Sequence, residues 1–215
     1  MTVTFPRTDI MDFVDWSQAT VPLTLMSRQE QSRLASGRTI GKDFGSALWF
    51  GDFTSVPLPA PLALQFEAMM ASLDGVIGTF ECGDMREDAQ YPAAHSNGGF
   101  MDTGILVGVG ADNKTLAISG LMAGFKLTVG DYLAFDYAGN RALHRVMETN
   151  SANNVGTTAY FEVRPHIRAG WVAGAPVTLK RPRGIFNLVP SSLKLAMNDS
   201  YSSTVSFQAI QAFSS

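Results

Sequence analysis

The sequence predicts a mainly β (α+β) protein: a β-sandwich- or barrel-like domain with one amphipathic helix, into which a small β-barrel-like domain is inserted. Three observations lead to this prediction. Short stretches of alternating apolar and polar residues, as in half-buried strands, recur along the chain. Glycine and asparagine punctuate the second half at short intervals, which is typical of small barrels and sandwiches. One segment has apolar residues at helical spacing, and 215 residues are enough for one domain with a second one inserted.

The surface is expected to be poor in charge. Charged residues make up 16% of the chain, against about 25% in typical soluble domains, and apolar residues make up 46%. A protein that buries much of its surface against partners tolerates this composition. The alternative is a monomer whose surface is rich in serine, threonine, asparagine and glycine. The net charge is −3, and the only concentration of basic residues, within 164–183, is weaker than that of a typical nucleic-acid reader. We interpret these residues as solvated strand ends or as contacts to an acidic partner.

The first domain is expected to begin with strands. Residues 21–26 alternate imperfectly between apolar and polar side chains, and a polar stretch follows at 27–33. Residues 36–40 and 46–53 are then predicted as two strands joined by turn residues 41–45. Trp49 in the second of these strands is large enough to anchor a core.

A helix is predicted over residues 60–74. Prolines lead into it, and proline is tolerated in the first helical turn. Its apolar residues repeat at helical spacing and form one stripe, and Gly75 suits the left-handed position after the helix. The next strand covers 76–82 and contains Phe80. The candidate core residues of this domain are Trp49, Leu62, Phe66, Met69, Leu73 and Phe80.

A long loop at 83–99 marks a domain boundary, because it combines charged and turn-forming residues. We expect residues 84–183 to form the inserted β-domain, and residues 1–83 together with 184–215 to form a discontinuous first domain. The glycine-rich segment 104–110 is interpreted as a flexible strand or turn. The predicted strands of the second half are 115–119, 132–137, 142–148, 158–163, 176–179, 185–189 and 201–210.

The residues that usually carry chemistry are scattered. His95, His144 and His166 have no metal-ligand spacing, and Cys82 has no base near it in the sequence. Phosphate-binding glycine loops and nucleophile elbows are absent, as is any apolar run long enough to span a membrane. We therefore predict no catalytic, cofactor-binding or metal-binding residues, no cofactor and no enzymatic activity. A carboxylate pair for glycoside hydrolysis stays open, because such pairs form only in the fold.

Several short motifs, taken in order, resemble a family of bacteriophage minor tail and distal tail proteins. In the first domain, a Ser-Gly-Arg segment at 36–38 precedes a strand with a tryptophan, and a proline-led helix follows. The helix ends in a Leu-x-Gly-x-x-Gly-Thr-Phe sequence at 73–80, and a Gly-Asp pair comes next at 83–84. The matching segments of the second half are 128–133, 143–146, 161–165, 184–188 and 201–209.

The resemblance implies a structural protein of the tip of a long non-contractile tail. Its partners would be further copies of the chain in a ring, expected to be a hexamer, together with the tail tube protein and the tail hub protein. Sequence-specific nucleic acid is not an expected partner. The protein would be located in the virion, and in the host cytoplasm during assembly. The alternative is a receptor- or glycan-binding module at the tail tip that stacks sugars on exposed tyrosine or tryptophan, and a cell-wall hydrolase subunit is the weaker third hypothesis.

Overall fold

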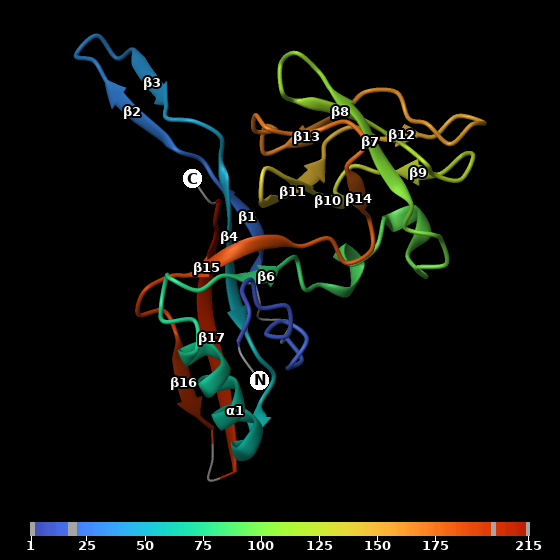
Figure 1. Ribbon diagram of the computed structural model, residues 1–215. Helices are drawn as coiled ribbons and strands as arrows, with labels where there is room; N and C mark the ends of the chain where they lie inside the picture. Colours follow the sequence, from blue (N-terminus) through green and yellow to red (C-terminus); the bar gives the residue numbers. More distant parts are fainter. Residues whose placement is uncertain (1–2, 17–20, 199–200, 214–215) are drawn as a thin grey trace.

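The computed structural model describes residues 3–16, 21–198 and 201–213. It is mainly β, with one α-helix among the described residues and a closed six-stranded barrel, as the sequence predicted (Figure 1). A seven-stranded antiparallel sheet forms the other part. Its central path runs through β1 (Val21–Met26), β4 (Leu48–Thr54), β17 (Ser202–Gln211), β15 (Gly184–Leu188) and β6 (Phe80–Cys82); β5 (Leu58–Pro59) and β16 (Lys194–Met197) also pair with β17.

Strands β4 and β17 form the centre of the sheet, and each has one buried face and one more exposed face. Alternate residues of β4 are buried, with Trp49 and Phe53 fully so. In β17, Val205 and Phe207 are buried on the same face as Phe53, whose ring lies 5.3 Å from that of Phe207. Period-two burial is what a half-buried strand requires, and it places the aromatic side chains under the helix.

The helix α1 (Ala60–Ala71) packs on β17 through a narrower stripe than the sequence predicted. Ala63, Phe66 and Met70 are its buried residues, whereas Leu62 is 39% exposed and therefore does not belong to the core. Successive residues are rotated by about 100° in a helix, so Leu62 lies to one side of the buried stripe. The spacing of apolar residues did not identify the buried face correctly. Glu67 is the only charged residue of α1, so several faces of the helix are apolar and the sequence does not show which of them is buried.

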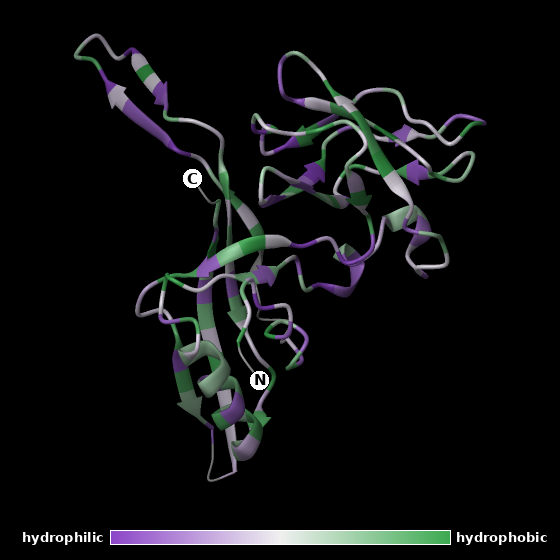
Figure 2. Cartoon of the chain, in the orientation of Figure 1, coloured by the Kyte–Doolittle hydropathy of each residue, from purple (hydrophilic) through white to green (hydrophobic). Residues whose placement is uncertain are grey.

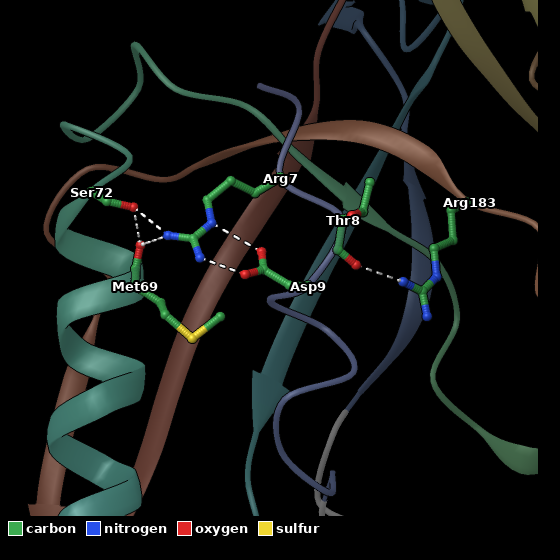
Figure 3. A network of polar contacts seen from close by, with 6 residues as sticks. All are labelled: Arg7, Thr8, Asp9, Met69, Ser72 and Arg183. Carbon is green, nitrogen blue, oxygen red and sulfur yellow. Dashed lines mark hydrogen bonds and ion pairs between the residues drawn. The ribbon is translucent and has the colours of Figure 1, made fainter. Parts of the chain in front are cut away.

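The N-terminal segment connects the end of α1 to the sheet (Figure 3). The Arg7 guanidinium pairs with Asp9 and donates to the Ser72 hydroxyl at 2.6 Å and to the Met69 carbonyl at 3.3 Å. Carbonyls in the last turn of a helix lack intrahelical partners, so Arg7 satisfies the end of α1. Farther along the N-terminal segment, Asp12 forms an ion pair with Arg183, the residue before β15.

The barrel lies between β6 and β15 in the sequence. Its own core contains Leu116, Leu133, Phe135 and Phe161, all buried. Around the barrel, the strands follow the order β10 (Tyr132–Tyr137), β11 (Asn140–Val146), β13 (Phe161–Arg164), β8 (Thr115–Ser119), β7 (Gly104–Val109) and β14 (Pro176–Thr178).

Two segments of this region are more ordered than the sequence indicated. The glycine-rich stretch expected to be a flexible strand or turn forms β7, a full member of the barrel. The expected loop at 83–99 contains two short 3₁₀ helices, η1 (Glu87–Ala89) and η2 (Ala93–His95). A small two-stranded pair, β9 (Lys126–Leu127) with β12 (Asn150–Ser151), lies outside the barrel path.

Candidate functional site: the hairpin arm and the junction

A two-stranded hairpin, called the arm here, projects from the sheet. It consists of β2 (Gln29–Arg33) and β3 (Thr39–Asp43), which pair with each other and continue the β1 and β4 pair beyond the sheet. Every residue of both strands is exposed. Figure 1 shows the arm standing away from both the sheet and the barrel. The arm is therefore exposed to solvent on all sides.

The sequence did not reveal the arm. Residues 27–33 were expected as a polar stretch, residues 36–40 as a strand and residues 41–45 as a turn; instead 29–33 and 39–43 are strands and the turn lies at 34–38. There the amide of Leu34 donates to the carbonyl of Arg38, and Gly37 has φ +80°. A strand buried on neither face carries no period-two pattern. The one available signal was Ser36-Gly37, a turn sequence between two segments of equal length.

The arm carries apolar side chains as well as charged ones. Leu34, Ile40 and Phe44 are 46%, 50% and 48% exposed, and the Lys42 ammonium lies 5.2 Å from the centre of the Phe44 ring. An apolar side chain at the tip, one in β3 and one at the base give the arm an apolar surface along its length. The arm thus combines an apolar surface with open backbone edges.

A cleft of about 280 Å³ lies at the root of the arm, between the arm and the barrel. One wall comes from the base of the arm and the segments that join it to β1 and β4, including Arg28 and Asp43; the other comes from the barrel, including Arg164 and His166. A hydrogen bond from the Ser46 hydroxyl to the His166 carbonyl, 3.1 Å long, crosses from one wall to the other. The root of the arm is thereby attached to the barrel.

The sheet and the barrel meet in a buried contact centred on Trp49, called the junction here. The Trp49 indole N–H donates to the carbonyl of Leu143 in β11 at 2.7 Å, and its ring lies 5.6 Å from that of Tyr132 in β10. Tyr132 and Leu143 belong to the core of the sheet although they are in barrel strands. The two parts therefore share a core at this place.

A buried carboxylate supports the junction. The Tyr132 hydroxyl donates to Asp84 at 3.2 Å, and Asp84 also accepts two hydrogen bonds from the Arg86 guanidinium, at 2.9 and 2.6 Å. Burial raises the pKa of Tyr132 to about 12, and the negative charge of Asp84 acts in the same direction. Tyr132 is therefore a neutral donor at physiological pH.

The chain enters and leaves the barrel through two adjacent segments. Gly184 at the start of β15 pairs with Cys82 at the end of β6. A β-carbon added to Gly83 would lie 2.5 Å from the carbonyl oxygen of Pro182, so glycine is required for this close approach. The two crossings therefore pack backbone against backbone where the barrel joins the sheet.

Gly83→Ala is expected to lower the free energy of unfolding by about 1–3 kcal/mol, because the added methyl forces the crossings apart. The measurement is urea unfolding followed by tryptophan fluorescence. Gly41→Ala in the arm is the matched control, because nothing lies within 4 Å of its added methyl. Equal stability of the two variants would show that the crossings are not tightly packed in solution.

Four of the six predicted core residues are fully buried. Trp49, Phe66, Leu73 and Phe80 are each at most 1% exposed, although Leu73 lies beyond the end of α1. Met69 is half-buried against the same core, and Leu62 is exposed as described above. Sequence reasoning missed the barrel side of the junction and Gln211 of β17, because contacts between distant strands leave no local pattern.

His95 lies apart from the other two histidines, whereas His144 and His166 border one small cavity. His95 stacks on Phe125 at 4.0 Å, His144 is buried in β11, and His166 lines the cleft at the arm root. No group of three or more histidine, cysteine, aspartate or glutamate side chains within residues 3–16, 21–198 and 201–213 is placed to hold a metal ion. Burial raises the pKa of the Cys82 thiol, which keeps it protonated.

Within the part of the chain that the structure describes, no helix has the length and apolar character needed to cross a membrane. Comparison with known proteins finds no family model that matches the chain and no curated protein that matches it.

Proposed function

We propose that this chain is a non-enzymatic structural subunit of a phage-type tail tip, located in the virion, which assembles with copies of itself into a ring that joins the tail tube to the hub. The exposed arm is the observation that carries the proposal. A two-stranded hairpin is at best marginally stable in water unless something packs against it, and every residue of both strands is exposed. A partner that covers the arm would stabilise it and bury its apolar side chains.

The arm is suited to contact with another polypeptide. Both of its edges carry backbone donors and acceptors that a neighbouring strand can pair with. Leu34, Ile40 and Phe44 add an apolar surface, while Arg33 and Glu30 add charges of both signs. Because the charge is mixed, the arm fits a protein surface better than the uniformly negative backbone of a nucleic acid.

A second copy of the chain is the partner that the surface favours. At the end of the sheet opposite the arm, Leu64 of α1 and Met197 of β16 are 65% and 79% exposed. Figure 1 shows the arm and α1 at opposite ends of the sheet, and Figure 2 shows apolar residues predominating along α1. An arm and a receiving surface on different parts of one chain make a head-to-tail contact, which closes into a ring when the rotation between neighbours fits.

Removing the arm is expected to convert the oligomer to a folded monomer. Replacing residues 29–43 by Asn-Gly keeps β1 paired with β4 and supplies a two-residue turn. Sedimentation velocity then compares the masses of the two proteins, and negative-stain images of the wild-type protein should show closed rings. Circular dichroism and thermal unfolding establish that the shortened chain still folds.

Two point variants provide a matched pair for the same experiment. Ile40→Ser in the arm should weaken the oligomer, while Val129→Ser, at a 62% exposed position in the barrel region, should leave its mass unchanged. A wild-type protein that stays monomeric at all concentrations would contradict the ring. A shortened chain that still forms the full oligomer would show that the arm does not make the contact.

A further inference from the structure

We propose that one internal water molecule binds between Gln211 of β17 and His144 of β11, and that it links the sheet to the barrel at the junction. The inference is independent of the proposed function, since it rests on the hydrogen-bonding needs of two buried side chains. Both residues are 3% exposed, and both line one small cavity between β11 and the end of β17.

The tautomer of His144 follows from its partner. Nδ1 lies 2.9 Å from the carbonyl oxygen of Pro165, which can only accept, so Nδ1 carries the proton. Nε2 is therefore a bare acceptor, and it has no hydrogen-bond partner among the described residues. The ring stacks on Phe135 with centroids 5.4 Å apart, so the packing holds Nε2 in place.

The orientation of the Gln211 amide follows in the same way. Its Oε1 accepts the backbone N–H of Trp49 at 3.4 Å, which only the oxygen can do. Nε2 of Gln211 then carries two N–H donors, and within the described part of the chain it too has no partner. An acceptor and a donor, each buried and each unsatisfied, thus border the same cavity.

The cavity selects the ligand by size and chemistry. Its volume is about 10 Å³, which is close to the minimum that holds one water molecule. The ligand must accept from Gln211 and donate to His144, and a single water does both. A metal ion does not fit, because Gln211 presents N–H groups there instead of an oxygen.

The bound water joins two strands that are far apart in the sequence. It lies beside the Trp49–Leu143 hydrogen bond, since Leu143 also lines the cavity. Burying a polar group without a hydrogen bond is unfavourable. The water satisfies one such group on each side of the junction, so it holds the sheet and the barrel in one relative position.

The test is a crystal structure of the full chain at about 1.8 Å or better. A density peak within about 2.7–3.2 Å of both nitrogen atoms is expected. ¹⁵N NMR of His144 should report protonated Nδ1 and an unprotonated Nε2. A direct Gln211–His144 contact, an empty cavity in a map that shows other internal waters, or an Nε2-protonated ring would each overturn the proposal.

Variants test the coupling across the junction in solution. Gln211→Met and His144→Phe each remove one partner of the water, so the double variant should lose less Tm than the two single losses added together. Gln208→Met is the matched control on β17, because the Gln208 amide donates to Asp52, away from the cavity. Its Tm loss should add to that of His144→Phe. Additivity in both pairs would reject a shared water.

Discussion

Truncating Phe66 to alanine is expected to lower the free energy of unfolding by about 3–5 kcal/mol. Phe66 is fully buried, and its ring lies 6.2 Å from the rings of Trp16 and Phe207 and 6.4 Å from that of Phe13. The substitution removes the side chain that joins α1, the N-terminal segment and β17. Because whole domains have stabilities of about 5–15 kcal/mol, the loss would be a large share of the total.

Leu62→Ala is the matched control for this prediction. Leu62 is one turn from Phe66 on the same helix but is 39% exposed, so its truncation should cost less than about 1 kcal/mol. Urea unfolding of the two variants, analysed with a common slope, gives both values. Similar losses for the two would mean that the helix is rotated relative to the sheet in solution.

Lowering the pH from 7 to 4 is expected to cost the folded protein about 3 kcal/mol through His144 alone. Burial lowers the pKa of His144 from 6.5 to about 4, against the opposing effect of the hydrogen bond to Pro165. Between pH 6.5 and about pH 4, the His144 ring is protonated in the unfolded chain but not in the folded chain. Stability therefore falls as the pH falls through this window, and the contribution stops growing below about pH 4.

Comparison with His144→Gln isolates this contribution, because other titrating groups affect both proteins alike. The difference in unfolding free energy between the two should be constant above pH 7 and change by about 3 kcal/mol on the way to pH 4. The other titratable residues lining the cavity are Tyr137, His166 and Arg168, none of them an acid that would stabilise the protonated ring. Parallel curves over the whole range would show that His144 is accessible to solvent.

Where a strand is buried on at least one face, the sequence was a good guide. The strands Thr115–Ser119 and Tyr132–Tyr137 have the predicted bounds. In β17, the predicted alternation is visible as buried Val205, Phe207 and Ala209. β17 carries this alternation because only one of its faces packs on the core, whereas Tyr132–Tyr137 is buried on both faces and was predicted as an apolar run between turn residues.

Where burial does not follow a regular pattern, sequence reasoning lost precision. The apolar stripe of α1 was placed to include Leu62, because an almost wholly apolar helix offers several faces of similar hydrophobicity. β7 was interpreted as a flexible strand or turn because the segment has glycine at positions 104, 108 and 110. A β-carbon added to Gly104 would lie 3.1 Å from the carbonyl oxygen of Val177, so the pairing of β7 with β14 leaves little space for a side chain there.

The candidate sites were the least predictable features. The arm was not predicted as a hairpin, although residues 36–40 were predicted as a strand, since strands exposed on all sides need no periodic pattern. Trp49 was predicted as a core residue, but its bond to Leu143 joins β4 to a strand more than ninety residues later. His144 was one of three scattered histidines until the fold buried it beside Gln211.

The sequence by itself therefore determined the mainly β class, the single predicted helix and most barrel strands, because these depend on local spacing and turn residues. Only the tertiary structure decided that the barrel and the sheet share a core at Trp49, that the arm projects, and that His144 and Gln211 border one cavity. Those features depend on which distant segments meet. That choice is made by the packing of the whole chain, and it leaves no periodic signal in any one segment.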